Sequence, residues 1–270
     1  MPDIDLNGVH TYYEKRGTGA PLVLVHGLGG STETWKKVAD PLAADFRVVA
    51  YDLRGCGRSA VPPGPYSLEQ LVDDLDDLVR GLGLGSVLLM GHSMGGSLAL
   101  AYAAARPGRV LGVVGVGAPS ELPEAGRDGM RTRAETVETQ GMGAVAETVA
   151  TNGMAPSFRE AHPDEFQAFV RLLGSNDPAG YAALCRVVAD LDITADLGRI
   201  APPVLLVAGT LDLVAPPAAN EANLARIPDA RYVPVVDCAH IVPWERPEAL
   251  VEAARPFLLE AGQAVGSAAR

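Results

Sequence analysis

The chain has 270 residues, of which 48% are hydrophobic, and its formal net charge is −11. This length suits one large domain, or a core domain that carries an insertion, and the apolar content is ample for a core. Because 33 acidic residues outweigh 22 basic ones and no stripe of Lys and Arg is present, nucleic acid and membrane surfaces are not expected as partners.

The N-terminus and the cysteines indicate the compartment. The first residues, MPDID, have neither a basic start nor an apolar stretch, so we expect no signal peptide. No apolar run approaches the roughly 20 residues of a membrane span. The three cysteines, Cys56, Cys185 and Cys238, are too few and too scattered for a disulfide framework or a zinc site. We therefore expect a cytoplasmic protein without a metal site.

Short apolar segments alternate with helical patterns along most of the chain. The expected strands are 9–13, 22–26, 46–51, 87–90, 110–116, 204–208 and 231–236, and the expected helices are 68–82, 94–105, 218–226 and 247–260. Several strands are near-continuous runs of β-branched residues, which is typical of strands buried on both faces of a parallel sheet. The alternation predicts an α/β fold with a mostly parallel central sheet flanked by helices.

An acidic run, Asp73-Asp74-Leu75-Asp76-Asp77, lies within the first of these helices. Apolar residues surround it at helical spacing. We therefore interpret its carboxylates as a solvated helix face and not as a metal site.

The alternation of strands and helices stops between about Pro119 and Arg199. This stretch is charged, rich in Met and helical in pattern, with no convincing strand. An insertion of this size at the carboxyl end of a sheet typically forms a lid, although a helical appendage on the surface is the alternative. We predict a core domain of residues 1–118 and 200–270 and a helical cap of residues 119–199.

The most informative segment joins an apolar strand to an Ala-rich helix through Gly91-His92-Ser93-Met94-Gly95. This is the G-x-S-x-G pattern of a nucleophile elbow, found in the strand–turn–helix context that the pattern requires. Gly91 and Gly95 lie where a side chain would collide with the neighbouring turn and helix. Ser93 is therefore expected in a strained conformation that presents its hydroxyl above the sheet, as the candidate nucleophile.

A serine hydroxyl is a weak nucleophile at neutral pH, so it needs a base and an acid that orients the base. In this arrangement the acid and then the histidine follow the serine along the chain. Asp212 lies just past a late strand, and His240 is the only one of five histidines that follows it. We predict Ser93, Asp212 and His240 as the catalytic residues.

The other histidines have different expected roles. His10 lies in an N-terminal strand and His162 in the insertion, whereas His26 and His92 neighbour motif positions and are expected to brace turns. Cys238, close to His240, is interpreted as loop packing and not as a second nucleophile.

Acyl transfer also needs donors for the negative charge that develops on the carbonyl oxygen. One predicted donor is the backbone N–H of Met94, directly after the nucleophile. The other is the backbone N–H of Leu28, in the loop His26-Gly27-Leu28-Gly29-Gly30 after an early strand. The alternative for this loop is a Gly-rich turn without a catalytic role.

With these segments together, the chain resembles the α/β-hydrolase superfamily over nearly its whole length. Residues 51–59, YDLRGCGRS, look like the superfamily loop that braces the site entrance. Within the superfamily the chain most resembles 3-oxoadipate enol-lactonases, on the elbow and on the segments 133–137, 180–185, 190–192 and 197–200. It differs from them at 153–156, where Gly-Met-Ala-Pro replaces Trp-Phe-Thr-Pro, and at 240–243, where His-Ile-Val-Pro replaces His-Leu-Ser-Asn.

The resemblance implies hydrolysis of a small-molecule ester or enol-lactone through an acyl-serine intermediate, without a cofactor. Ser93 argues against epoxide hydrolases and haloalkane dehalogenases, which have Asp at the elbow. Carbon–carbon bond hydrolases and cofactor-free haloperoxidases retain the serine and stay open as alternatives. A ligand-binding receptor, as plant strigolactone receptors are, is the alternative from another class, and a homo-oligomer is compatible with all of these.

Two further groups of residues are left with two readings each. Trp35, Met142, Met154 and Tyr181 either line the substrate pocket or pack in the core. Arg133 is either a partner for a substrate carboxylate or a solvent-exposed residue of the cap.

Overall fold

The computed structural model describes residues 3–6 and 8–268, with side chains as far as residue 263. One sheet of eight strands forms the centre of the described chain, in the order β1-β2-β4-β3-β5-β6-β7-β8. The strands are β1 (Asp3–Leu6), β2 (Val9–Arg16), β3 (Ala20–Val25), β4 (Phe46–Tyr51), β5 (Val87–His92), β6 (Val110–Val116), β7 (Val204–Gly209) and β8 (Ala230–Val235). The β1–β2 and β2–β4 pairs are antiparallel and all other pairs are parallel, so the predicted mostly parallel sheet is confirmed.

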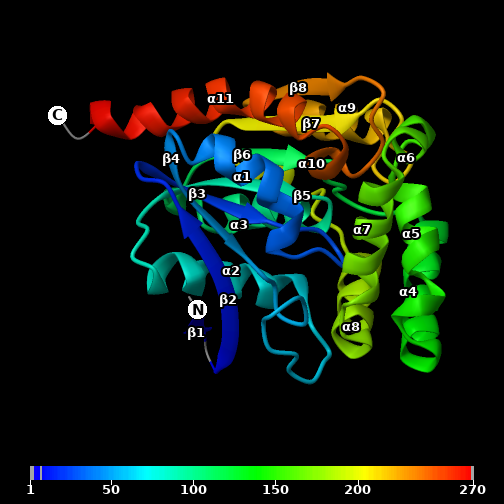
Figure 1. The fold of residues 1–270 in the computed structure, drawn as a ribbon. Helices are drawn as coiled ribbons and strands as arrows, with labels where there is room; N and C mark the ends of the chain where they lie inside the picture. The colour runs from blue at the N-terminus through cyan, green and yellow to red at the C-terminus, as the bar shows by residue number, and fades with distance from the viewer. Residues whose placement is uncertain (1–2, 7, 269–270) are drawn as a thin grey trace.

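Helices cover both faces of this sheet (Figure 1). The helices of the sheet layers are α1 (Lys36–Leu42), α2 (Leu68–Gly81), α3 (Met94–Ala105), α9 (Pro217–Arg226), α10 (Val242–Glu245) and α11 (Pro247–Ala268). Apolar residues of α2, α3 and α9 form one core with the sheet, and those of α1 and α11 form a second core on the opposite face. The fold is that of an α/β protein with two apolar layers, one on each side of a buried sheet.

The predicted bounds of β4, β6 and α3 match the structure, and those of β5 and β7 end one or two residues early. Every residue of β5 and of β7 is buried, which explains their unbroken apolar sequences. The sequence pattern does not indicate β1 or α1, because β1 has only 4 residues and α1 contains Pro41. The last helix is predicted to end near residue 260, whereas α11 continues to Ala268.

The acidic run in α2 is less exposed than we expected. Asp74 is buried, and its two carboxylate oxygens accept hydrogen bonds of 2.5 Å from Nε and Nη2 of Arg54. Asp76 accepts a bond of 2.9 Å from the hydroxyl of Tyr102. The interpretation of a uniformly solvated face was therefore wrong, because the tertiary fold brings donors from other elements onto it.

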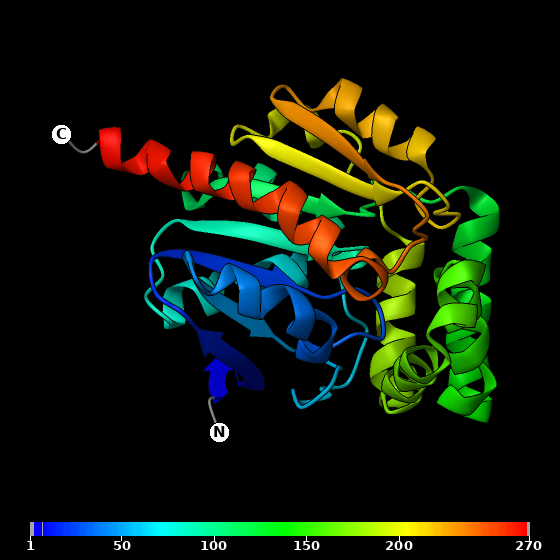
Figure 2. The same cartoon turned by 45° about the horizontal axis from the view of Figure 1, so that its top comes forward.

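Five further helices lie between β6 and β7 in the chain and stand across the carboxyl ends of the parallel strands (Figure 2). They are α4 (Glu124–Gln140), α5 (Ala146–Gly153), α6 (Pro156–Ala161), α7 (Pro163–Gly174) and α8 (Pro178–Ala189). The two ends of this segment meet, since Glu121 and Asp192 form a β-bridge and the N–H of Ile193 donates to the carbonyl of Ser120. We call α4–α8 the cap helices.

No helix in the described part of the chain is both long enough and apolar enough to span a membrane.

Candidate active site

The turn after β5 holds Ser93 in a conformation that L-amino acids rarely adopt, with φ 53° and ψ −124°. Neighbouring backbone segments lie very close to this turn at two glycines. A Cβ on Gly91 would lie 2.1 Å from the carbonyl oxygen of Gly95, and a Cβ on Gly95 would lie 2.3 Å from that of Val25. Glycine is therefore required at both positions, and the sharp turn points Ser93 out of the sheet.

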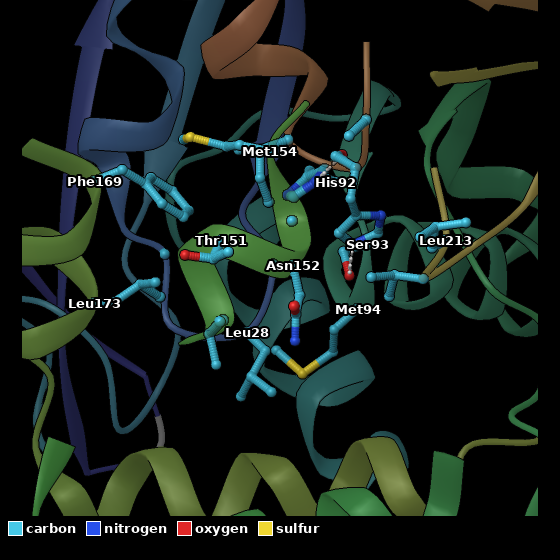
Figure 3. Close-up of a pocket in the computed structure, with 18 of the residues that line it drawn as sticks. Leu28, His92, Ser93, Met94, Thr151, Asn152, Met154, Phe169, Leu173 and Leu213 are labelled. Carbon is cyan, nitrogen blue, oxygen red and sulfur yellow. Dashed lines mark hydrogen bonds between the residues drawn. The ribbon is translucent and has the colours of Figure 1, made fainter. Parts of the chain in front are cut away.

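The structure brings the three predicted catalytic side chains into one hydrogen-bonded chain. Nε2 of His240 lies 2.9 Å from Oγ of Ser93, and Nδ1 of His240 lies 2.8 Å from Oδ2 of Asp212. Ser93 follows β5, Asp212 follows β7 and His240 follows β8, so the carboxyl ends of parallel strands supply all three. Figure 3 shows Ser93 facing a cavity between the sheet edge and the cap helices.

Asp212 is buried, and every contact of its carboxylate fixes the histidine or the loop. Its Oδ1 accepts hydrogen bonds from the backbone N–H groups of Val214 at 2.8 Å and Ala215 at 2.9 Å. Burial alone would raise the pKa of Asp212, but the His240 ring and these N–H donors lower it on balance below its ordinary value. An ionised carboxylate only accepts, so Nδ1 of His240 carries a proton and Nε2 is free to accept from Ser93.

His92 and His26 make hydrogen bonds that fix the turns around the serine. Nε2 of His92 lies 2.9 Å from the carbonyl oxygen of His240, to which it donates. Burial, and then the neighbouring His240 ring, lower the pKa of His92 to about 3. Nε2 of His26 accepts from the N–H of Leu53 at 3.0 Å, and its Nδ1 donates to the carbonyl of Gly27 at 2.8 Å. His92 thus holds the loop of His240 as well as its own turn.

The two predicted oxyanion donors come from different segments, one within the elbow and one in the loop after β3. Met94 is the first residue of α3, so its N–H has no carbonyl partner within the helix. Leu28 lies in the loop after β3, and both residues line the cavity (Figure 3). Both predicted donors therefore belong to residues of the cavity that Ser93 also lines.

The cavity has a volume of about 560 Å³ and is walled by the sheet edge below and by the cap helices above. Met154 and Tyr181 line the cavity, which is one of the two roles expected for them. Arg133 and Arg159 also line it and bring positive charge to it. Trp35 and Met142 do not line it. Trp35 is fully buried between α1 and the sheet, and Met142 packs among the cap helices, so core packing is the correct reading for both.

The family described as "alpha/beta hydrolase fold" matches residues 20–247. The chain belongs to this family. The 3-oxoadipate enol-lactonase 2 of Acinetobacter baylyi is 30% identical over 228 residues, which are 84% of each chain. The enol-lactonase structure from Burkholderia xenovorans superposes with a TM-score of 0.92 at 30% identity, over 96% of this chain and 100% of that one. A malate-bound esterase from Thermogutta terrifontis gives a TM-score of 0.91 at 31% identity, over 97% and 98%.

This hydrolase has one buried carboxylate near the site that the sequence analysis missed. Glu245 lies in α10, and its Oε2 accepts from the N–H of Ala155 at 2.8 Å while its Oε1 accepts from that of Ala239 at 3.2 Å. Burial raises the pKa of Glu245, in spite of these backbone donors. The signal was an acidic residue inside the otherwise apolar segment that follows His240.

Further hydrogen bonds connect the same two parts of the hydrolase. The N–H of His240 donates to the carbonyl of Gly153 at 2.9 Å, and that of Ile241 donates to the same oxygen at 3.2 Å. Gly153 is the last residue of α5, and Ala155 lies two residues further along the chain. The loop of His240 and the end of α5 are therefore one hydrogen-bonded unit, which we call the junction.

The three cysteines are buried free thiols, and none joins the site chemistry. Burial raises the pKa of the Cys238 thiol, so it is held as a poor nucleophile. Within the described residues, no group of three or more His, Cys, Asp or Glu side chains is arranged to hold a metal ion.

Proposed function

We propose that this hydrolase cleaves a carboxylic ester or an enol-lactone in two steps, through an acyl-serine intermediate. The observation that carries the proposal is the hydrogen-bonded chain from Ser93 through His240 to Asp212, with its serine end open to the cavity. That chain can remove a proton from a hydroxyl that otherwise holds it at neutral pH.

In the first step, Nε2 of His240 accepts the proton of Ser93 Oγ as the oxygen attacks the carbonyl carbon. The N–H groups of Leu28 and Met94 stabilise the oxyanion, each by roughly 3 kcal/mol. The C–O bond then breaks, and His240 returns the proton to the leaving oxygen. In the second step, water attacks the acyl-serine with His240 as its base, and Asp212 stabilises the imidazolium in both steps.

Enol-lactonases and an esterase are among the relatives that are similar over most of the chain, which supports this class of substrate. Other relatives of similar identity and coverage are described as putative carbamate hydrolases. We further propose that residues 119–199 act as a lid over the core of residues 1–118 and 200–270. The position of the cap helices across the carboxyl edge of the sheet supports that division. No step requires a cofactor or a metal.

The test combines covalent labelling with turnover. We expect a fluorophosphonate to label the protein once per chain, with the adduct on the tryptic peptide that contains Ser93. We expect p-nitrophenyl acetate and an enol-lactone to be hydrolysed over many turnovers. Labelling elsewhere, or the absence of turnover on every ester and lactone, would overturn the proposal.

The same panel separates the alternatives. A single burst, together with a shift of the melting temperature by the ligand, would indicate a receptor. Turnover of a vinylogous diketone in preference to esters would indicate a carbon–carbon bond hydrolase, and halide oxidation with peroxide would indicate a haloperoxidase.

A further inference from the structure

Exposed apolar side chains are concentrated at one place on this protein. In the described part of the chain, five large hydrophobic residues are exposed, and four of them follow the ends of β7 and β8. Their exposed fractions are 45% for Leu211, 87% for Leu213, 46% for Val214 and 68% for Val236. We call these four residues the apolar lip. The fifth residue, Val61, is 40% exposed and follows the loop after β4.

The apolar lip is continuous with the active-site cavity. Leu211, Leu213 and Val214 line the cavity, and Figure 3 shows Leu213 beside Ser93, across from Phe169. Val236 lies outside this cavity and lines a separate hollow with residues of β8 and α11. It borders the Asp212 loop, because the N–H of Thr210 donates to the carbonyl of Val235. The part of the lip that lines the cavity therefore consists of Leu211, Leu213 and Val214.

The backbone fixes the outward direction of these side chains. The N–H of Leu211 donates to the carbonyl of Cys238 at 2.9 Å, and the N–H of Val214 donates to Asp212 at 2.8 Å. Asp212 is buried, whereas Leu211 and Leu213 on either side of it are exposed. A group of exposed apolar side chains at the mouth of a cavity is typical of a ligand-binding surface.

We propose that the apolar lip binds the aliphatic chain of the substrate as it leaves the cavity. The inference rests on the proposed function and narrows the substrate class to esters or lactones with an extended alkyl part. Four side chains offer far less than the roughly 800 Å² per partner of a stable protein interface. The net charge of −11 also disfavours an anionic lipid surface. Continuity with the cavity favours the substrate itself.

The experiment measures kcat/KM for p-nitrophenyl esters from acetate to decanoate, below their micelle concentrations. In the wild-type protein we expect a rise of about twofold per methylene for chains that reach the lip, because each methylene is partly removed from water. In Leu213→Ser the ratio of decanoate to acetate falls about fivefold, and in Leu213→Met it is retained. Val61→Ser is the matched control, since it removes an exposed apolar side chain away from the cavity and keeps the wild-type ratio.

A second series of acetate esters with alkyl alcohols from ethyl to decyl tests the leaving-group side. A lip effect in either series supports the proposal, and an unchanged ratio for Leu213→Ser in both overturns it. A dimer that Leu213→Ser dissociates, or binding to phosphatidylcholine vesicles that it abolishes, would also overturn it by assigning the lip to another occupant. If the wild-type protein hydrolyses no ester at all, the proposed function itself fails, which is a different result.

Discussion

The sheet edge and the cap helices enclose the same cavity, but they are built in different ways. At the sheet edge every residue of β5 and β7 is buried, and backbone atoms approach so closely that glycine is required. In the cap, α4 buries only Ala134 and Val137 among its described residues and faces the cavity with long side chains such as Arg133. At the sheet edge, the backbone therefore determines where Ser93, Asp212 and His240 lie. In the cap, side chains that can be replaced determine the shape and charge of the cavity.

The largest expected effect comes from removing the nucleophile at the sheet edge. Ser93→Ala should lower kcat for an ester by about 10⁶-fold, because no other group takes over the attack. Ser97→Ala is the matched control in the helix that follows Ser93. Its hydroxyl donates to the carbonyl of Pro119 at 2.6 Å and lies 3.3 Å from the backbone carbonyl of Ser93, so the variant removes a neighbouring hydroxyl and keeps the nucleophile. Steady-state kinetics measure both variants, and activity retained by Ser93→Ala contradicts the mechanism.

One pair of glycine substitutions tests the comparison directly, because the two substitutions should change the free energy of unfolding in opposite directions. Gly91→Ala places a methyl group 2.1 Å from the carbonyl oxygen of Gly95 and should destabilise the fold by about 3 kcal/mol or more. Gly129→Ala lies in α4, where a Cβ meets no atom within 4 Å, and should stabilise the protein by about 0.5–1 kcal/mol. Urea unfolding gives both values. Equal effects would show that the two regions tolerate change alike.

The buried His92 makes the stability of the sheet edge depend on pH. Its pKa is about 3 in the folded protein and 6.5 in the unfolded chain, so the unfolded chain binds the proton first as the pH falls. Its contribution is therefore complete above pH 6.5 and is lost progressively towards pH 3. Between pH 7 and pH 5 the wild-type free energy of unfolding should fall by about 2 kcal/mol more than that of His92→Gln.

The matched control for this measurement is His10→Gln, since His10 is exposed on β2. Urea unfolding of this variant should retain the fall in the free energy of unfolding between pH 7 and pH 5 that we assign to His92. If His92→Gln retains that fall as well, then His92 is not held neutral by burial.

The smallest effect is expected at the junction, where the two regions meet. In Glu245→Gln an amide NH2 replaces one carboxylate oxygen and faces a backbone N–H. The hydrogen bond from the N–H of either Ala155 or Ala239 is therefore lost. We expect kcat/KM to fall about tenfold at temperatures well below unfolding, with fluorophosphonate labelling of Ser93 slowed and not abolished. Glu248→Gln, on the exposed side of α11, should retain wild-type kinetics. Wild-type kinetics in Glu245→Gln would show that the junction does not orient His240.

The sequence was informative about the sheet edge because its constraints are local. Gly91, Ser93 and Gly95 are close in the chain, and the apolar run before them shows that they follow a buried strand. The positions of Asp212 and His240 after later strands follow from the same logic, since parallel strands end at a common edge. The structure brings these side chains within hydrogen-bond distance of one another.

The residues that were misread or missed depend on partners far away in the chain. Asp74 is buried because Arg54 reaches it, and Glu245 is held by a backbone N–H of residue 155. For Trp35 the sequence allows two readings, and its burial in the core that α1 and α11 form with the sheet decides between them. Such contacts have no periodic pattern, so spacing in the chain does not identify the partners.

The amino-acid sequence alone determined the fold class, the glycine-dependent turn at Ser93 and the order of the acid and the base. These features depend on the alternation of apolar residues and on the space that a missing side chain leaves. Only the tertiary structure decided which cap residues face the cavity, how Glu245 connects the cap to His240, and that the loop of Asp212 presents an apolar lip. These features depend on contacts between segments that are far apart in the chain. Ala155 and Glu245, for example, form a hydrogen bond across 90 residues.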